Sequence, residues 1–382
     1  MKTRIISLAF YCLLLAACNS QTDDLLLNRL DVDYLVNPIV GNITTGDEVR
    51  AWLIGDSSII GFGGDYAFYT NNDFDSLYSV TPNNATLKSG TILYNDFENI
   101  VLQQAGDDLY IEETNDYGQT YSPKIQKSRF EERSEGGVSI TGTHSFDAAA
   151  FAGIDIGWVF SRYTALSGSD LFPTAAKVYN IVKNGSTGET SIIHIADLPA
   201  EYAPISANFF NALSGYLLTR SSTNSNNYVF VTGDGGFSWE GPFIVGNTAY
   251  NMQHIALSDP QNLYIYSKDK IGIYASHDGG MTWQYAEPYL ANLSHYGVLD
   301  LYVVNQQVAY AALARAADDI ATIGDVFRTD DGGNTWTKAN QAAMYAEYID
   351  CIDAHTCIAT SKNVVQITRD GGATWKVLVY PL

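Results

Sequence analysis

Basic residues are scarce in this sequence, which carries 21 Lys and Arg against 42 Asp and Glu, a formal net charge of −21 at pH 7. That excess of acid argues against nucleic acids and anionic lipid surfaces as partners, because both repel a negatively charged protein. Cysteine is also rare, with four residues, and no segment shows a sustained helical period of apolar residues. A separate helical or catalytic domain is therefore not predicted.

A short apolar run lies near the N-terminus. Lys2 and Arg4 precede the apolar residues 5–15, which are too few to form a membrane-spanning stop-transfer helix, so residues 1–17 are predicted to be an export signal. Without the two basic residues of this signal, the mature chain carries 19 basic against 42 acidic side chains, a formal charge of −23. A chain of that charge needs an anchor other than electrostatic attraction to reach a membrane.

The signal ends in Leu15-Ala-Ala-Cys18, which resembles the bacterial lipobox. The resemblance implies cleavage before Cys18 and attachment of a diacylglycerol to its thiol, followed by a polar tether over residues 18–45. Asn19, rather than Asp, follows the cysteine, which in enteric-type bacteria is typical of outer-membrane cargo. We expect an exported lipoprotein anchored at the outer membrane or cell surface, and an ordinary signal peptide with an incidental cysteine is the alternative.

Two thiols, Cys351 and Cys357, remain after processing besides the lipidated one, since Cys12 leaves with the signal. Disulfides persist in exported proteins, and the two cysteines flank a short turn between predicted strands, so a disulfide is expected. Metal ligation by both cysteines and His355 is the alternative.

One short pattern recurs along the chain. It reads S/T-x-D-x-G-x-x-W at residues 232–239 (TGDGGFSW), 276–283 (SHDGGMTW), 329–336 (TDDGGNTW) and 368–375 (TRDGGATW), and a fifth copy at 114–121 (TNDYGQTY) ends in Tyr. Such a pattern predicts a tight hairpin in which the Asp side chain accepts hydrogen bonds from turn amides and Gly supplies a positive φ. The closing Trp begins the outgoing strand and is expected to pack against a neighbouring unit.

We call these segments the aspartate turns, and they resemble the Asp-box (BNR) repeat. Their aspartates are predicted to be structural rather than metal-binding or catalytic, because each carboxylate is used by its own turn. These residues are Asp116, Asp234, Asp278, Asp331 and Asp370.

The last four of these aspartates lie 44, 53 and 39 residues apart, the length of a four-stranded propeller blade. Alternating apolar strands fill each interval. The sequence therefore predicts an all-β fold, a seven-bladed β-propeller over residues 46–382, with six or eight blades as alternatives. The predicted blades cover 46–82, 88–126, 138–198, 203–245, 250–290, 298–344 and the remainder to 382.

A basic residue closes the second predicted strand in five blades, and in three of them an aromatic residue stands four positions earlier. The basic residues are Arg162, Arg220, Lys268, Arg315 and Lys362. Equivalent positions predict a cationic ring at one mouth of the propeller that would bind carboxylates or another anion. Tyr202, Tyr250, Tyr296 and Tyr345, in or near the links between blades, would supply an aromatic rim. The alternative is that basic residues at strand ends keep these ends soluble.

Two families share these features. The photosystem II assembly and stability factors are seven-bladed propellers with repeats similar to Gly157-Trp-Val-Phe-Ser-Arg162, and this resemblance implies a basic patch that holds a partner polypeptide. Sialidases carry Asp-boxes and three arginines, but their Arg-Ile-Pro string is absent, so no catalytic residue carries over. We predict a non-catalytic scaffold for a protein segment or an anionic glycan, without cofactor or metal, and keep a sialidase-like glycosidase as the alternative.

Overall fold

The chain is described in segments by a computed structural model. The described residues are 49–55, 58–63, 66–70, 78–80, 91–95, 100–105, 108–113, 122–128, 130–135, 138–152, 156–165, 175–183, 186–187, 189–246, 251–288, 295–315, 324–339, 346–361 and 364–379. They divide between two compact units, one formed by residues 1–81 with 350–382 and the other by residues 82–349. Cys18, the tether and Asp116 lie outside them. No helix in the described segments is long and apolar enough to cross a membrane.

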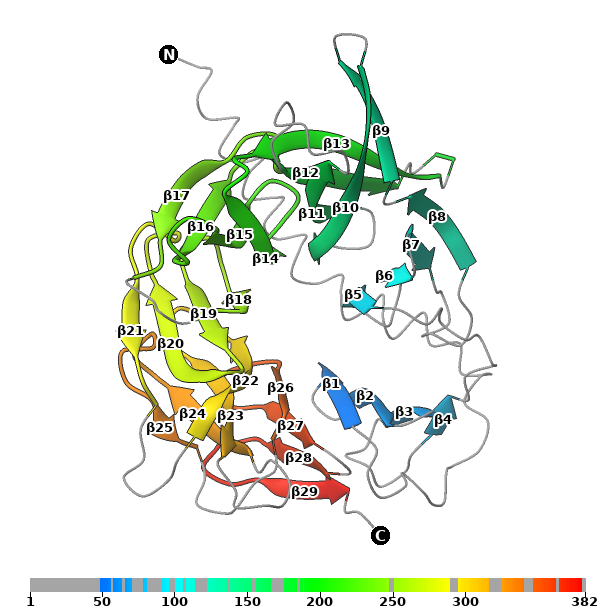
Figure 1. Ribbon diagram of the computed structural model, residues 1–382. Coiled ribbons are helices and arrows are strands. Elements are labelled where there is room, and N and C mark those ends of the chain that lie inside the picture. Colours follow the sequence, from blue (N-terminus) through cyan, green and yellow to red (C-terminus); the bar gives the residue numbers. More distant parts are fainter. Residues whose placement is uncertain are drawn as a thin grey trace, which may run out of the picture. The chain divides into compact units, whose positions relative to one another are not determined.

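The larger unit is built from five antiparallel sheets in which each strand pairs with the next along the chain (Figure 1). The first sheet contains β5 (Thr91–Asn95), β6 (Ile100–Ala105), β7 (Asp108–Glu113) and β8 (Ser122–Ser128). The second contains β9 (Phe130–Glu135), β10 (Val138–Phe151), β11 (Ile156–Ala165), β12 (Ala175–Lys183) and β13 (Thr190–Leu198).

The remaining three sheets of this unit have four strands each. They contain β14 (Tyr202–Phe209), β15 (Gly215–Ser221), β16 (Asn227–Thr232) and β17 (Glu240–Ile244); β18 (His254–Leu257), β19 (Leu263–Ser267), β20 (Lys270–Ser276) and β21 (Gln284–Ala286); and β22 (His295–Val303), β23 (Ala309–Arg315), β24 (Gly324–Thr329) and β25 (Thr337–Lys338).

The smaller unit contributes two further four-stranded sheets. One contains β1 (Val49–Gly55), β2 (Ser58–Gly63), β3 (Tyr66–Thr70) and β4 (Tyr78–Val80), and the other contains β26 (Tyr348–Cys351), β27 (Cys357–Ser361), β28 (Val364–Thr368) and β29 (Lys376–Val379). Strand β26 begins two residues before the unit boundary. Within this unit β1 contacts β27.

The sheets agree with the predicted all-β fold of four-stranded antiparallel blades. If the extra strand β9 is left aside, the first strand of each sheet in the larger unit contacts the first strand of the next, as in β10 with β14 and β14 with β18. A side chain joins two of these first strands: Ile255 N, in β18, donates to Ser206 Oγ of β14 at 3.4 Å. First-strand contacts of this kind are what blades packed around a common axis produce. Seven-bladed closure stays a prediction.

Strand β9 is a fifth strand that the sequence pattern does not predict, because its residues are mostly charged or polar. It pairs with the first half of β10, from Val138↔Glu135 to Thr143↔Phe130, whereas β11 pairs with the second half of β10. Gly136 and Gly137 lie between the paired Glu135 and Val138, and a two-residue Gly-Gly connection is typical of a tight hairpin. The β9–β10 hairpin therefore extends the second sheet beyond its four-stranded part (Figure 1).

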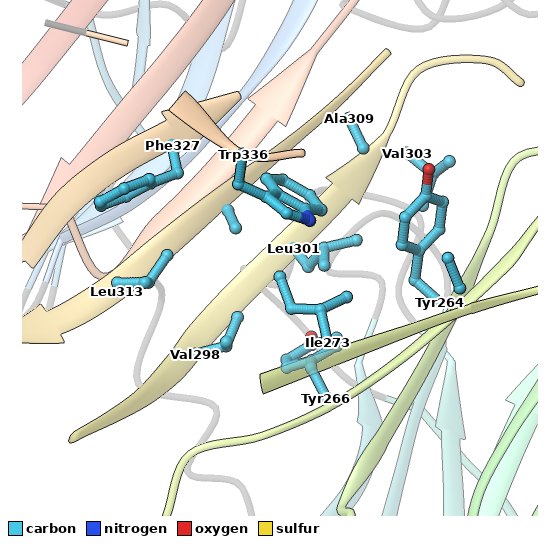
Figure 2. Packing of buried hydrophobic residues seen from close by; sticks show 12 residues of the cluster. Tyr264, Tyr266, Ile273, Val298, Leu301, Val303, Ala309, Leu313, Phe327 and Trp336 are labelled. Carbon is cyan, nitrogen blue, oxygen red and sulfur yellow. The ribbon is translucent and has the colours of Figure 1, made fainter. Parts of the chain in front are cut away.

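Apolar side chains are buried between successive sheets of the larger unit. Figure 2 shows the cluster in which Trp336, at the end of an aspartate turn, packs across β22 and β23 toward Tyr264 of the preceding sheet. The two rings meet edge to face with centroids 6.2 Å apart. Trp239 likewise meets Phe160 of the sheet before its own, at 5.8 Å. The predicted packing of the closing Trp against a neighbouring unit is thus observed in two turns.

The four described aspartate turns share one hydrogen-bond pattern. In the turn of Asp278, Oδ1 accepts from the backbone N of Thr282 at 2.8 Å and from the hydroxyl of Ser276 at 2.9 Å, and Oδ2 accepts from Thr282 Oγ1 at 2.6 Å. The equivalent bonds form around Asp234, Asp331 and Asp370. Gly280 has a φ of 88°, which favours glycine. The carboxylates therefore hold their own turns, as the pattern predicts.

The aspartate turns are expected to weaken at low pH. Burial alone would raise the pKa of Asp278, but hydrogen bonds from Thr282 and Ser276 outweigh burial and hold the pKa below its ordinary value of 3.8. A carboxylate with a lowered folded-state pKa contributes stability above its unfolded-state pKa, and this contribution is lost as the pH falls through the folded-state value.

Asp278→Asn should therefore lower the free energy of unfolding at pH 7. The difference from the wild type should shrink as the pH falls below about 4. Urea denaturation across this pH range measures it, and a difference that does not change with pH would contradict the assignment.

A disulfide joins Cys351 at the end of β26 to Cys357 at the start of β27. Both cysteines are buried, with 3% and 0% of their surface exposed. The bond closes the turn that contains His355, whose backbone N donates to Asp353 Oδ1 at 2.6 Å. Because the sulfur atoms are bonded to each other, they do not serve as thiolate ligands in this structure.

Candidate functional site

Four of the five predicted basic positions lie at or near the ends of the second strands of four successive sheets in the larger unit, if the extra strand β9 is not counted. Arg162 belongs to β11, Arg220 to β15 and Arg315 to β23, while Lys268 directly follows β19. For Arg315 the backbone alone is described, and Lys362 falls outside the described residues. These strand ends are opposite to the ends that carry the aspartate turns, because each sheet is antiparallel with sequential pairing.

The aromatic residue four positions before a basic one is buried in the core. Trp158, Tyr216 and Tyr264 have at most 3% of their surface exposed. Two of them pack under the aspartate turn of the next sheet: Trp158 Nε1 donates to Gly235 O at 2.7 Å, and Tyr264 lies against Gly333. In each of these sheets, the aromatic residue is therefore buried in the core near the start of the second strand. The basic residue four positions later has access to solvent at the other end.

Arg162 is already paired with a carboxylate. Its Nε lies 2.6 Å from Asp147 Oδ2 and its Nη2 lies 3.1 Å from Asp147 Oδ1, a two-bond arrangement that also raises the pKa of the guanidinium. Ser145 Oγ donates to the same carboxylate at 2.7 Å. Asp147 therefore offsets the charge of Arg162 within the chain, and a role of Arg162 in binding a ligand stays a prediction.

The position of Asp147 depends on a β-bulge. The register between β10 and β11 shifts between Phe146 and Ala148, so Asp147 is the extra residue. First strands β14 and β22 shift at comparable places, between Pro204 and Ser206 and between Val298 and Asp300. Bulges re-aim side chains beside binding sites. The sequence pattern did not reveal Asp147 as a site residue, because a bulge leaves no period-two signal.

Arg220 is half-buried, and within the described part of the chain it forms no ion pair. Tyr202 stands one residue before Ala203, the cross-strand partner of Arg220. A hydrogen bond to Glu201, then burial and nearby negative charge, raise the pKa of Tyr202 to about 12, so its hydroxyl stays protonated. Because residues paired across the strands share a face of the sheet, the side chains of Tyr202 and Arg220 lie on opposite faces.

Lys268 is exposed and lies beside a neutral histidine. Burial, and then the charge of Lys268, lower the pKa of His254 to about 4, so the ring is uncharged at neutral pH. His254 stacks on Tyr266 with ring centroids 5.0 Å apart. Gln253 fixes the turn, because its Oε1 accepts from Lys268 N at 3.1 Å and its Nε2 donates to Asp269 at 2.5 Å.

A chain of contacts links the Arg220 and Lys268 positions. Asn227 pairs across the strands with Arg220, and its side chain exchanges hydrogen bonds with the backbone of Met252, at 3.4 and 3.5 Å. Met252 directly precedes Gln253, which holds the backbone of Lys268. On the far side, a Cβ at Gly297 of β22 would lie 1.9 Å from Lys268 O, so glycine is needed for this approach.

The predicted aromatic rim is described in part. Tyr202 is half-buried and meets Tyr228 and Phe230 edge to face, with centroids 5.3 and 5.1 Å apart, so part of its ring packs within its own sheet. Tyr296 belongs to β22, and its side chain is outside the described part. Tyr250 and Tyr345 lie outside it altogether.

No protein-family model and no curated protein matches the sequence. Solved structures match the fold at low identity. A structure of prolyl endopeptidases is 9% identical with a TM-score of 0.53, covering 88% of this chain and 50% of that one. YCF48 bound to D1 peptide is 13% identical with a TM-score of 0.39, covering 74% and 93%. The Hadza microbial sialidase Hz136 is 13% identical with a TM-score of 0.38, covering 88% and 66%. These likenesses concern the β-propeller fold alone.

Proposed function

We propose that this chain is a non-catalytic binding scaffold that holds an acidic protein segment or an anionic glycan at the ends of its second strands. The observation that carries the proposal is the neighbourhood of Arg220 and Lys268: two cations on adjacent sheets, joined through Asn227, Met252 and Gln253. In a chain of such acidic composition, two cations on adjacent sheets, one of them beside neutral His254, favour an anionic ligand.

Arg162 takes a different part in this proposal. Its bond to Asp147 fixes a rigid polar edge beside the two cations and leaves them as the residues that meet the ligand. A guanidinium that already holds a carboxylate contributes less to a second anion. The proposal rests on these side chains, not on the fold likeness to YCF48 or to a sialidase.

The setting of this scaffold belongs to the same proposal. A lipid on Cys18 would anchor the chain at the outer membrane or cell surface, and residues 46–382 would close as a seven-bladed propeller of Asp-box repeats. Mass spectrometry of the mature protein tests the first point: we expect an N-terminal peptide that begins at Cys18 and carries an acyl-glyceride mass. A free thiol at Cys18 would contradict it.

Charge reversal tests the binding site. Arg220→Glu and Lys268→Glu should each weaken binding of a fluorescein-labelled acidic peptide by about tenfold or more, because each replaces an attraction by a repulsion. Fluorescence anisotropy with the full-length protein in detergent measures the affinity, and a uronic-acid oligomer serves as competitor to separate the glycan from the peptide. Lys376→Glu is the matched control, since Lys376 is an exposed cation on β29. The site would be rejected if all three variants lost affinity equally, or if none of them lost affinity.

A further inference from the structure

Large apolar side chains are exposed on the β14–β17 and β18–β21 sheets at the ends that carry the aspartate turns. These ends are opposite to the ends that carry Arg220 and Lys268. Phe210 and Leu213, in the β14–β15 turn, are 45% and 59% exposed. Phe237 and Met281, in two aspartate turns, are 65% and 57% exposed. Isolated apolar residues on a surface are ordinary, whereas contiguous ones mark interaction sites. We call these four residues the apolar turn patch.

Backbone hydrogen bonds hold the patch together within the β14–β17 sheet. Gly235 N, in the aspartate turn, donates to Leu213 O at 2.9 Å, and Phe210 N donates to Ser214 O at 3.0 Å. Asn211 fixes the same turn, because its Oδ1 accepts from the backbone N of Leu213 at 2.8 Å. Two turns that are distant in sequence therefore present their apolar side chains from one fixed platform.

The patch continues toward the next sheet. Tyr216, at the start of β15, donates its hydroxyl to Pro260 O in the β18–β19 turn at 2.5 Å. Gly280, next to Met281, lies against Val229 of β16. Burial raises the pKa of Tyr216 to about 12, so this bond between the sheets keeps its proton. The turns of the two sheets are thus in contact on the face that carries the patch.

The turn geometry does not require these side chains. The residue after the two glycines is Phe237 in one aspartate turn and Met281 in the next, but the corresponding residues of the other two described turns are Asn334 and Ala373. All four turns keep the same carboxylate hydrogen bonds. Phe237 and Met281 are therefore not needed to form their turns, and a partner that covers them gives a reason for their presence.

Carboxylates lie in the turns of the patch and in a turn next to it. Asp234 and Asp278 belong to the turns of Phe237 and Met281, and Asp259 belongs to the β18–β19 turn. Hydrogen bonds lower the pKa of Asp234 and, against the opposite effect of burial, the pKa of Asp259 and Asp278, so all three are charged at neutral pH. Among Lys, Arg and His residues, His277 is the nearest in sequence to Met281. Its Nδ1 forms a hydrogen bond with Asn262 Oδ1 at 2.8 Å. An apolar surface with a negative rim complements apolar residues flanked by Lys or Arg and repels anionic lipid.

We propose that the apolar turn patch docks a basic amphipathic segment of a partner protein, on the face opposite to Arg220 and Lys268. The apolar side chains of such a segment would cover Phe210, Leu213, Phe237 and Met281, while its cations would meet the carboxylates of the turns. The scaffold then has two binding faces of opposite charge preference, one for anionic and one for cationic partners.

The test uses two fluorescein-labelled 14-residue peptides, one of Leu and Lys at helical spacing and one in which Glu replaces every Lys. The full-length protein in detergent should bind the Leu/Lys peptide and not the Leu/Glu peptide. The variant Phe210→Ser/Leu213→Ser/Phe237→Ser should weaken that binding by at least about tenfold, because three apolar contacts are lost. Ile193→Ser is the matched control, since Ile193 is 51% exposed on the outer strand β13.

Several outcomes would overturn the proposal. Equal weakening by Ile193→Ser would show non-specific attraction to an acidic protein, and unchanged binding in the triple variant would exclude the patch. Binding of the wild type to phosphatidylcholine vesicles, lost in the triple variant, without binding of the Leu/Lys peptide would assign the patch to a membrane surface. Arg220→Glu should leave peptide binding within twofold, so the two faces are tested independently. Hydrogen exchange on the triple variant checks that its sheets are intact.

Discussion

Trp158→Ala is expected to lower the free energy of unfolding by about 3–5 kcal/mol, the range for removing a fully buried large aromatic side chain. None of the Trp158 surface is exposed, and its ring stacks on Phe209 with centroids 3.5 Å apart. Its Nε1 also donates to Gly235 O at 2.7 Å, so the substitution removes a link between two sheets together with the core contact. Urea denaturation followed by tryptophan fluorescence and circular dichroism measures the loss.

Two further variants separate packing from hydrogen bonding at this site. Trp158→Phe keeps much of the ring burial but leaves Gly235 O without its donor, and should cost about 1–3 kcal/mol. Phe237→Ser, in the exposed part of the same turn, should change the free energy of unfolding by less than about 0.5 kcal/mol. A Trp158→Ala loss no larger than that of Phe237→Ser would show that the aromatic position does not hold the sheets together.

Asp325→Ala is expected to lower the free energy of unfolding by about 3 kcal/mol, near the lower end for breaking a buried ion pair. Asp325 is the second residue of β24 and is fully buried. Its Oδ1 lies 2.7 Å from Lys338 Nζ. Without the carboxylate, the ammonium of Lys338 stays largely desolvated and unpaired. Because the Lys338 side chain keeps 19% of its surface exposed, it can reach some solvent, and the loss stays near that lower limit.

The same sheet offers a matched control. Arg328 pairs with Asp330 at 2.5 Å, but the side chain of Asp330 is 63% exposed, so Asp330→Ala should cost less than about 1 kcal/mol. Replacing both buried partners, as in Asp325→Leu/Lys338→Met, should recover most of the loss from Asp325→Ala. Similar losses from Asp325→Ala and Asp330→Ala in thermal and urea denaturation would contradict the effect of burial.

The two proposed faces of this protein follow from one property of a sequentially paired antiparallel sheet. The turns at the two ends of its strands point in opposite directions, so the aspartate turns and the basic strand ends separate without further design. Each repeated sheet therefore has both kinds of end. The residue at one position of the turn can differ between sheets, as with Met281 in one sheet and Asn334 in the next. Such a difference changes part of one face without altering the turn. Such surfaces are where a repeated scaffold acquires specific partners.

The sequence by itself determined the all-β class, the sheet intervals and the geometry of the aspartate turns. Each of these depends on local rules: Asp278 bonds to residues within four positions of itself, and Gly280 needs only its own backbone freedom. The tertiary structure decided which side chains meet across sheets. Asp147 is the extra residue of a bulge beside Arg162, and Leu213 O accepts a hydrogen bond from Gly235 N, in the separate turn that carries Phe237. Such contacts depend on register and on packing between strands, which a single sequence does not encode at fixed spacing.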